Sequence, residues 1–427
     1  MLEEWLLWLS SLHPNELWAI LGFMLMVDGT RYAFCTTCMA AVDLWLAVWD
    51  WLLGRKAPTE YEHCPSICLL LVGHNEGDSI EGGLASVWGR YPRMEIVVVD
   101  DGSTDDMADG ARRFASKHAG VLVLSRKERG GKSSALNWAL GYTRAEIIVC
   151  VDTDSHLSDT SLWEIVQPFT DPTVGAVSAC VAARNPFVNL CTWLQAYEYR
   201  QTIFMGRMMQ ERLGMLAIVS GAFGAFRRSL LEQLGAWDVG PGEDGDLTLR
   251  ILKAGYRVAV APLAFCLTDV PTGWKRLFNQ RKRWDRTVVT FECRKHLDLS
   301  FFWYCNFRLM HLYMMLERWY FNIACVFTYW GYGIWLCSVY AGNVWHLLAL
   351  LYLCQLALEV VQLLLLLGYS HTPGRDLLTS LVIPFYPLYQ AFLKAADLVA
   401  IIEEMFFRKS RDDNFVPARV RDATWHW

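Results

Sequence analysis

Long apolar segments bracket a central region of ordinary polarity, and this arrangement constrains the chain more than any other feature. Trp18 to Leu53 is almost continuously apolar, broken by Asp28-Gly29-Thr30-Arg31, and Val344 to Leu367 is nearly as apolar. A helix needs about 20 residues to cross a bilayer core. The first segment is long for one span and short for two, so we expect one overlong or steeply tilted helix, with a tight hairpin of two helices as the alternative.

The C-terminal region contains two further candidate spans. Trp319 to Tyr340 is a clear one, and Leu377 to Ile402 is a weaker one that contains two prolines and could span or lie partly in the interface. Charged residues make up only 19% of the chain, whereas a soluble domain has about 25%. Arg55 and Lys56 close the first apolar segment and favour a cytosolic location for the central region. The net charge of −5 gives no reason to expect a nucleic acid as a partner.

The central region, residues 60 to 290, has the pattern of an α/β domain. Four short apolar runs rich in β-forming residues predict strands: Ser66 to Val72, Glu95 to Val99, Val121 to Leu124 and Ile147 to Val151. Segments of helical character separate them: Ile80 to Trp88, Met107 to His118 and Lys132 to Tyr142. Unbroken apolar strands that alternate with helices indicate a parallel sheet buried on both faces.

Acidic residues follow two of these strands at the point where each strand ends. Asp100 and Asp101 follow the second strand, and Asp152 and Asp154 follow the fourth. In a doubly wound sheet, ligands bind beyond the carboxyl ends of the strands. Two carboxylates one residue apart can hold a divalent ion whose other ligands are diphosphate oxygens. The alternative is that these acids only form turns.

Two more polar clusters come later in the chain. Gly242-Glu243-Asp244-Gly245-Asp246 precedes a predicted helix over Leu247 to Ala254, and Asp244 is a candidate general base. The alternative is a helix cap, for which Asp246 is the stronger candidate. Gln280-Arg281-Lys282-Arg283-Trp284 combines guanidinium donors for phosphate with an indole face for a sugar ring. It could instead be a basic stripe on an interfacial helix.

Taken in order, the clusters resemble the signature of the processive family 2 membrane glycosyltransferases, which include cellulose, chitin, hyaluronan and poly-N-acetylglucosamine synthases. That signature is an Asp at a strand turn, a DxD pair, an ED pair and QxxRW. The resemblance covers residues 64–290 closely and the flanking spans in general layout. It implies an α/β, GT-A-type (Rossmann-like) cytosolic domain inserted between transmembrane α-helices.

The resemblance and the composition divide the chain into five expected parts. These are an N-terminal interfacial helix with transmembrane segments over 1–56, a cytosolic GT-A domain over 57–270, interfacial amphipathic helices carrying QxxRW over 271–303, C-terminal transmembrane helices over 304–405 and a cytosolic tail over 406–427. The expected location is the plasma (inner) membrane, with the catalytic domain in the cytosol.

The resemblance also implies a donor site. Residues expected to meet the nucleotide base, the ribose or the diphosphate are His74, Asn75, Glu76, Asp100, Asp101, Lys132, Asp152, Gln280 and Arg283. Asp152 and Asp154 would coordinate Mg²⁺ or Mn²⁺ on the diphosphate. The donor would be a UDP-sugar, either UDP-GlcNAc or UDP-Glc.

On the acceptor side, Asp244 would be the general base, with Glu243 beside it. Trp284 would stack under the acceptor sugar, and the small residues Ser220 and Gly221 would line the acceptor pocket. The implied reaction is a single displacement that inverts an α-linked donor to a β-linked product. Repeated additions would elongate an exopolysaccharide that passes across the membrane.

Two positions depart from the family pattern. Gly242 stands where the family often has Thr, and Asp285-Arg286 follows QxxRW where cellulose synthases are expected to have small residues. The short chain resembles the N-acetylglucosamine polymerases and chitin-oligosaccharide synthases more than the cellulose synthases.

Two other functions remain open at this point. One is a ceramide glucosyltransferase-like enzyme that adds a single sugar to a lipid, and the other is a non-catalytic transporter or scaffold. The expected partners are the UDP-sugar donor, the growing polysaccharide and the lipid bilayer. A narrow polymer channel built from so few helices would also need an accessory membrane subunit, which is a hypothesis from the span count alone.

Overall fold

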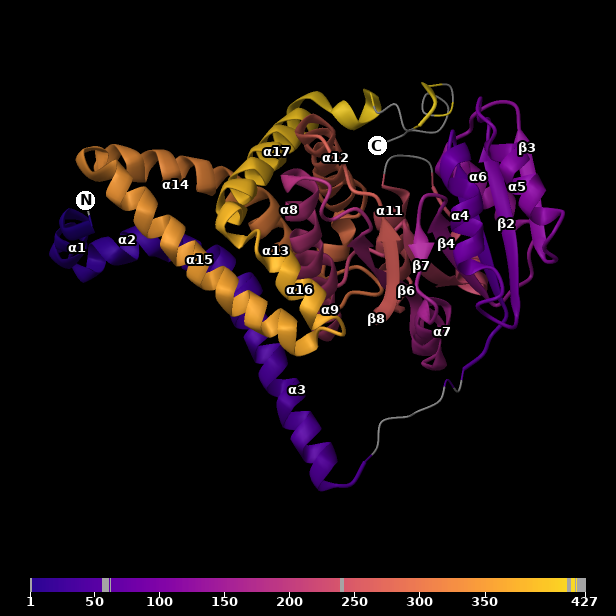
Figure 1. Cartoon of the computed structure of the whole chain (residues 1–427), viewed down its shortest axis with the longest axis horizontal. Helices are drawn as coiled ribbons and strands as arrows, with labels where there is room; N and C mark the ends of the chain where they lie inside the picture. The colour runs from indigo at the N-terminus through magenta and orange to yellow at the C-terminus, as the bar shows by residue number, and fades with distance from the viewer. Residues whose placement is uncertain are drawn as a thin grey trace.

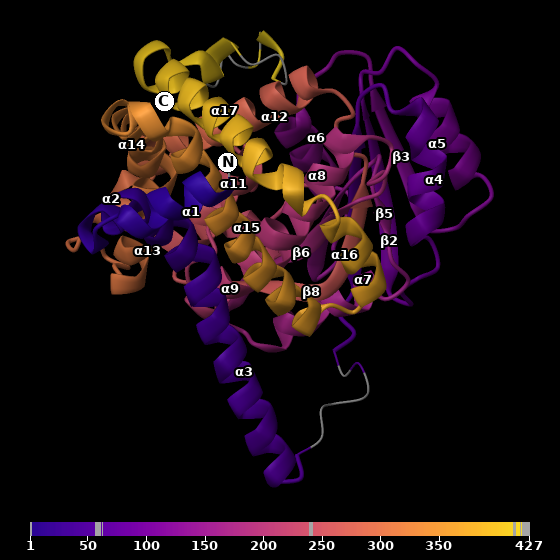
Figure 2. The same ribbon diagram turned by 60° about the vertical axis from the view of Figure 1, so that its left-hand side comes forward.

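The computed structural model describes residues 2–55, 61, 63–238, 242–412, 416–418 and 420. An α/β body lies on one side of the molecule and a group of long helices on the other (Figure 1). The body corresponds to the central region of the sequence, and the long helices come from both ends of the chain (Figure 2).

One sheet of eight strands organises the body within the described residues, in the order β3-β2-β1-β4-β7-β6-β8-β5. The strands are β1 (Ile67–Gly73), β2 (Met94–Asp101), β3 (Val121–Arg126), β4 (Ile147–Asp152), β5 (His156–Leu157), β6 (Val174–Ala183), β7 (Phe223–Arg227) and β8 (Arg257–Thr268). β1 pairs with β2 and β4 in parallel, and β2 pairs with β3 in the same way. The four predicted strands and their parallel pairing are therefore confirmed.

The second half of the sheet differs from the expected parallel arrangement. β7 runs antiparallel to both β4 and β6, and β5 runs antiparallel to β8. β7 begins beside the end of β4 that carries Asp152. A hydrogen bond of 3.2 Å from the Asp152 amide to the Ala222 carbonyl shows this. β7 must then run back along β4, so the sheet is mixed.

Both faces of the sheet are buried, as the apolar strands predict. Alternate residues of β1 point to opposite cores, with Cys68 and Leu70 on one side and Ile67, Leu69 and Leu71 on the other. The helices between the parallel strands are α4 (Gly77–Val87), α5 (Met107–Ala115) and α6 (Lys132–Leu140), which confirms the three predicted helices. α4 and α5 cover one face, while α6 covers the other.

Further helices of the body surround the second half of the sheet. They are α7 (Ser161–Val166), α8 (Leu190–Tyr199), η3 (Arg200–Met205), α9 (Gly206–Arg212), α10 (Arg228–Leu234), α11 (Glu243–Lys253), α12 (Trp274–Thr287), η4 (Val288–Lys295) and η5 (Leu297–Ser300). α11 contains the predicted helix over Leu247 to Ala254, with Ala254 as its C-terminal cap. α12 carries the QxxRW residues.

The N-terminal apolar segment forms one helical run. After α1 (Leu2–Ser11), the chain passes through α2 (Pro14–Met24), the wider π-helical η1 (Leu25–Phe34) and α3 (Cys35–Leu52) without a break. This confirms the single overlong helix and excludes the hairpin. Arg31 in the middle of the run pairs with Glu317 at 2.9 Å, which compensates a charge that would otherwise be buried alone. Lys56 lies outside the described residues.

The C-terminal helices include two that are long and apolar enough to cross a membrane, over 341–369 and 383–407 within the described residues. The first comprises η7 (Ala341–Asn343) and α15 (Val344–Tyr369), and the second comprises η8 (Ile383–Phe385) and α17 (Tyr386–Phe407), with α16 (Pro373–Ser380) between them. The segment expected as a clear span, Trp319 to Tyr340, is not among these two. It is helical, through α13 (Leu309–Trp319), η6 (Tyr320–Ala324) and α14 (Cys325–Val339), but its Trp, Tyr and Gly residues lower its mean hydropathy.

Candidate active site

The Lys132 ammonium lies where four distant segments of the chain meet. Its Nζ donates to Asp152 Oδ1 at 2.6 Å and to the Gly221 carbonyl at 3.2 Å, and it lies 3.6 Å from Glu243 Oε1. Burial acts to lower the pKa of Lys132, but the charges of Asp152 and Glu243 outweigh it, and the pKa is raised. The lysine is therefore a permanent cation at the carboxyl end of β4.

Asp244 lies in the first turn of α11 and faces the same point. Its Oδ2 accepts a hydrogen bond from the Gly221 amide at 3.1 Å, and its Oδ1 accepts one from the Gly245 amide at 2.8 Å. A Cβ on Gly221 would lie 3.2 Å from Asp244 Oδ2 and 3.3 Å from Lys132 Nζ. The absence of a side chain at Gly221 therefore lets the carboxylate and the ammonium approach each other.

Glu243 lies beside Asp244 and is more enclosed. Burial raises its pKa, Lys132 acts to lower the pKa, and the charge of Asp244 raises it further. The neighbouring Ser220 is buried, and its amide donates to Ser178 Oγ at 3.3 Å. The structure thus brings together six predicted residues: Lys132, Asp152, Ser220, Gly221, Glu243 and Asp244.

Asp152, Asp154 and Glu76 lie near enough for their negative charges to act on one another. Burial and then the charge of Asp152 raise the pKa of Asp154. Burial and then the charges of Asp154 and Asp152 raise the pKa of Glu76. A bound cation would offset this mutual repulsion. Within the described residues, no group of three or more His, Cys, Asp or Glu side chains could hold a metal ion by itself. The two carboxylates of Asp152 and Asp154 fit Mg²⁺ or Mn²⁺ that takes its remaining ligands from a diphosphate.

Asp100 and Asp101 are both buried, and their carboxylates are used inside the protein. Asp100 accepts from the Ser103 amide at 2.9 Å and from Ser125 Oγ at 2.6 Å. Asp101 accepts from the amides of Gly130 and Gly131 at 2.9 and 2.8 Å, and it pairs with Arg126. Both aspartates hold the loops around the expected nucleotide site, and Asp101 fixes the turn that leads into Lys132.

His74 and Asn75 join the loop after β1 to the loop after β2. His74 Nδ1 lies 3.1 Å from the Asp101 carbonyl. The Asn75 amide donates to Ser103 Oγ at 2.9 Å, and Asn75 Oδ1 accepts from the Thr104 amide at 2.8 Å. Asn75 adopts φ 61, a left-handed conformation that Asn tolerates better than most residues. These contacts place both residues at the same carboxyl edge as Asp152.

On α12, Arg281 contacts one of the predicted QxxRW residues, Trp284. Arg281 was not among the residues predicted from the sequence. Arg281 is buried, pairs with Glu198 at 2.8 Å, and places its guanidinium carbon 4.4 Å from the centre of the Trp284 ring. Trp284 keeps 38% of its surface exposed. Gln280 Oε1 is buried without a partner among the described residues, while Arg283 is half-buried one turn further along α12. Nothing in the basic run distinguishes Arg281 from its neighbours.

Asp246 is not a helix cap, which corrects the alternative considered from the sequence. The N-cap of α11 is Gly242, and Asp246 is buried in a charged cluster with Arg250 at 2.9 Å, Lys295 at 2.6 Å and His296 at 2.8 Å. Gly242 has φ 84, and a Cβ there would lie 2.6 Å from Thr287 Cγ2. The departure from Thr at this position therefore has a local physical reason.

Comparison with known proteins agrees with this arrangement. The model of the family described as "Glycosyltransferase like family 2" matches residues 74–287, half of the chain. The chain belongs to this family.

Named relatives of this family 2 glycosyltransferase cover its central region. A poly-beta-1,6-N-acetyl-D-glucosamine synthase of Staphylococcus aureus is 29% identical over 235 residues, which are 54% of this chain and 57% of the relative. The synthase of the same name from Staphylococcus epidermidis is 29% identical over 229 residues, which are 53% of this chain and 55% of the relative. The chain thus matches little more than half the length of these relatives.

A solved structure supports the fold of this family 2 glycosyltransferase. The mannosyltransferase from Pyrobaculum calidifontis, in complex with GDP-Man and Mn²⁺, superposes with a TM-score of 0.56 at 22% identity. The match covers 88% of this chain and 99% of that protein. At this identity the likeness establishes the GT-A-like fold and nothing further.

The second departure from the family pattern is also explained by packing. Lys282 and Arg286 on α12 both pair with Glu403 on α17. Lys282 Nζ lies 3.0 Å from Glu403 Oε1. Asp285 is buried, and burial followed by the charge of Asp397 on α17 raises its pKa well above the ordinary value. Asp285 and Arg286 of this glycosyltransferase therefore attach the QxxRW helix to α17.

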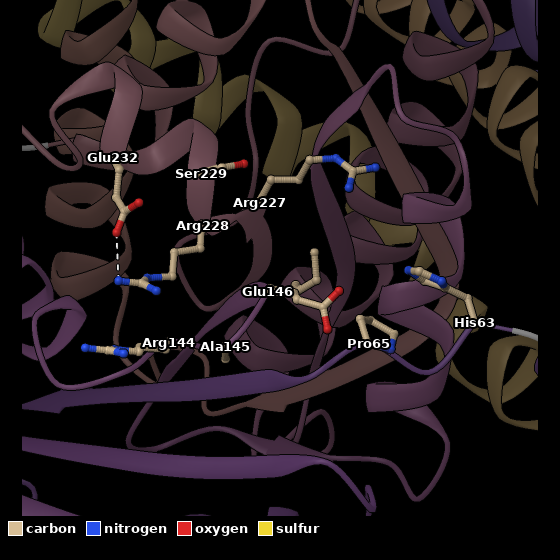
Figure 3. A pocket seen from close by; sticks show the side chains of 10 residues that line it. His63, Pro65, Arg144, Ala145, Glu146, Arg227, Arg228, Ser229 and Glu232 are labelled. Carbon is tan, nitrogen blue, oxygen red and sulfur yellow. Dashed lines mark ion pairs between the residues drawn. The ribbon is translucent and has the colours of Figure 1, made fainter.

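A cavity of about 340 Å³ lies at the opposite edge of the sheet, where β4 begins and β7 ends (Figure 3). Its lining includes three arginines, Arg144, Arg227 and Arg228. Arg227 donates to the backbone carbonyls of Val174, Phe169 and Asp171 at 2.6 to 2.8 Å, and Arg228 pairs with Glu232 at 2.7 Å. None of the predicted site residues lines this cavity, so the candidate active site is elsewhere.

Proposed function

We propose that this chain is an inverting, processive β-glycosyltransferase that uses a UDP-sugar to elongate an exopolysaccharide. One observation carries the proposal: Asp244, Gly221, Lys132 and Asp152 are linked by contacts of 2.6 to 3.2 Å at the carboxyl end of β4. The proposed base Asp244 and the metal-ligand candidate Asp152 therefore lie on either side of the Lys132 cation. Gly221, which has no side chain, lies between them and leaves space for a substrate.

Asp244 is the proposed general base. The Gly221 and Gly245 amides hold its two oxygens in place, which fixes the direction from which an acceptor hydroxyl can approach. Asp244 would take the hydroxyl proton while the acceptor oxygen bonds to the anomeric carbon on the face opposite the diphosphate. The bond from that carbon to the diphosphate oxygen breaks, UDP leaves, and the configuration changes from α to β.

The donor side would be held by residues of the first half of the sheet and by α12. Asp152 and Asp154 would hold Mg²⁺ or Mn²⁺, which when bound supplies positive charge beside the leaving diphosphate. Gln280 and Arg283 would steady the diphosphate, since a guanidinium donates to phosphate oxygens in a bidentate way. His74, Asn75, Glu76, Asp100, Asp101 and Lys132 would surround the nucleotide.

The acceptor would lie between Trp284 and the Ser220-Gly221 segment. The stacking of Arg281 on one face of Trp284 fixes the indole and leaves an exposed face for a sugar ring. The relatives named as poly-β-1,6-N-acetylglucosamine synthases favour a polymer product and UDP-GlcNAc as the donor over UDP-Glc. They also favour a polymer over the single-addition lipid glycosyltransferase.

We also propose the membrane placement that the sequence predicts. The apolar helices within 1–56 and 304–405 would lie in the plasma (inner) membrane, with the domain 57–270 in the cytosol and 271–303 at the interface. An accessory membrane subunit would complete the polymer channel.

A panel of UDP-sugars tests the proposal directly. Purified protein with Mg²⁺ or Mn²⁺ is expected to release UDP from UDP-GlcNAc and to form products whose length grows with time. Asp244→Asn should lower the rate about 10³-fold or more without lowering the melting temperature. A single glycolipid product would favour the lipid glycosyltransferase. No UDP release from any sugar nucleotide, with no effect of Asp244→Asn in cells, would favour a transporter or scaffold.

A further inference from the structure

One buried carboxylate joins the QxxRW helix to a long apolar helix of the C-terminal group. Glu198 lies near the end of α8, and its Oε2 accepts hydrogen bonds from Arg281 Nη2 at 2.8 Å and from the Tyr389 hydroxyl at 2.6 Å. Glu198, Arg281 and Tyr389 are 6%, 8% and 2% exposed. The helices that carry them, α8, α12 and α17, lie next to one another in Figure 1 and in Figure 2. Three segments that are far apart in the sequence therefore meet at one oxygen atom.

The contact with Glu198 orients the guanidinium of Arg281 beneath Trp284. The Nε of Arg281 is buried without a hydrogen-bond partner among the described residues, so the guanidinium depends on its ion pair with Glu198. Its central carbon lies 4.4 Å from the centre of the Trp284 ring. The stacking of a planar guanidinium on an aromatic face depends on direction. Trp284 is half-buried, so the core does not hold its ring from all sides. A change at Glu198 therefore reaches Trp284 through Arg281.

The hydroxyl of Tyr389 holds the other side of this carboxylate. A hydrogen bond from a hydroxyl to a carboxylate is among the strong ones in proteins. The ring of Tyr389 packs separately, with its centre 6.4 Å from that of Phe392 and 6.3 Å from that of Trp274. These ring contacts do not involve the hydroxyl. Removal of the hydroxyl should therefore release Glu198 while the ring stays packed.

Residues next to Glu198 attach the same segment to two other C-terminal helices. The Tyr197 hydroxyl donates to Glu359 on α15 at 3.1 Å, and Arg200 pairs with Asp376 on α16 at 2.6 Å. All four side chains are buried. Breaking either contact would leave a buried polar group unsatisfied, which is unfavourable. The end of α8 is therefore fixed against α15 and α16, and the bond from Tyr389 to Glu198 forms in one relative position of α8 and α17.

We propose that Glu198 and Tyr389 position the indole of Trp284 through Arg281, so that α17 helps to set the affinity of the site for the acceptor sugar. The inference rests on the function proposed above, in which Trp284 stacks under the acceptor. Glu198 and Tyr389 are positioning residues, since they act on Trp284 through Arg281. Because they do not act on the metal-ligand candidates Asp152 and Asp154, their loss should weaken the binding of the acceptor and not that of the donor.

Tyr389→Phe tests the proposal with the smallest change. The purified full-length chain is assayed for UDP release from UDP-GlcNAc, with a short oligosaccharide of β-linked N-acetylglucosamine as the acceptor, and the KM of each substrate is measured separately. Tyr389→Phe should raise the KM of the acceptor about fivefold, because misplacement by 1 Å costs about 10²-fold and a smaller shift costs less. Its products should be shorter than those of the wild type, and the KM of UDP-GlcNAc should stay unchanged.

Two other variants complete the test. Tyr386→Phe is the matched control, because Tyr386 is buried in the first turn of α17 but does not hydrogen-bond to Glu198 within the described part of the chain. It should behave like the wild type. Arg281→Lys keeps a cation beside Glu198 but removes the planar group that stacks on Trp284. It should raise the KM of the acceptor as Tyr389→Phe does.

The proposal is wrong if Tyr389→Phe and Tyr386→Phe have the same acceptor KM and product length, or if the KM of donor and acceptor rise equally. A lower melting temperature with an unchanged acceptor KM would also overturn it, because the contacts would then only stabilise the fold. A wild-type chain that releases no UDP from UDP-GlcNAc would refute the proposed function, and this inference with it. An active wild type with an unaffected Tyr389→Phe variant would refute the inference alone.

Discussion

Replacing Gly221 by Ala is the sharpest test of how the candidate base is positioned. The new Cβ would lie 3.2 Å from Asp244 Oδ2 and 3.3 Å from Lys132 Nζ, so each neighbour must move by a few tenths of an ångström. Misplacement of a reacting group by 1 Å costs about 10²-fold in rate, so we expect a loss of about tenfold in kcat, or ~1.4 kcal/mol in the activation barrier. Gly221 does not have a positive φ, so Ala can adopt its backbone conformation.

Gly245→Ala is the matched control for Gly221→Ala. Gly245 is the residue after Asp244 and donates the second hydrogen bond to it, but no atom lies within 4 Å of an added Cβ. UDP release by the purified variants gives kcat, and thermal unfolding in detergent reports stability. Gly221→Ala should slow turnover while the free energy of unfolding changes by less than about 1 kcal/mol, and Gly245→Ala should leave both unchanged or slightly raise stability. Full activity of Gly221→Ala, or an equal loss in Gly245→Ala, would refute the positioning argument.

Three further outcomes are expected. Gly242→Ala should lower the free energy of unfolding by about 1–3 kcal/mol in thermal melts, because Gly242 has φ 84 and the new Cβ would meet Thr287; an unchanged melt would contradict this. Asp246→Asn should cost about 3 kcal/mol at pH 7, since it removes the buried carboxylate that pairs with both Arg250 and Lys295. Burial acts to raise the pKa of Asp246, but His296, Arg250 and Lys295 outweigh it, and the pKa is lowered. The stabilisation of the folded state by the Asp246 carboxylate is therefore complete above about pH 4 and is lost as the pH falls further. A difference in unfolding free energy between the variant and the wild type that stays constant down to about pH 2 would contradict this. Chelation by EDTA and the variant Asp154→Asn should each abolish UDP release without lowering the melting temperature, because burial and Asp152 already raise the pKa of Asp154; metal-independent turnover would contradict this.

The parallel half of the fold could be predicted because its strands are rich in branched apolar residues. The run ending in Val99 and the run ending in Val151 both match observed strands. β6 was not predicted, since Val174–Ala183 is mostly small residues whose strand character depends on packing between β7 and β8. The antiparallel direction of β7 depends on where the chain returns after α9, which local pattern does not encode.

For the candidate site, the sequence predicted that residues from distant segments lie together, but it did not indicate what holds them in place. Asp244 and Lys132 do lie together, but the ordered spacing of motifs does not indicate that the missing side chain of Gly221 lets them approach each other. Asp100 and Asp101 were expected to meet the nucleotide, and nothing in the local sequence indicated that the Asp101 carboxylate also holds the Gly130-Gly131 turn. Arg281 was indistinguishable from its basic neighbours, because its role depends on Glu198, 83 positions away in the sequence.

The meeting of four segments at Lys132 has a consequence for biogenesis. Lys132 and Asp152 belong to the first half of the sheet, whereas Gly221 and Glu243 are synthesised later and reach the lysine only after β7 has docked along β4. A nascent chain that stops before α11 holds Lys132 and Asp152 but lacks Asp244, the proposed general base, so we expect that it does not turn over the donor. We therefore expect activity to appear in a single step during assembly. Two complementary fragments should transfer sugar only after the two halves of the sheet have paired.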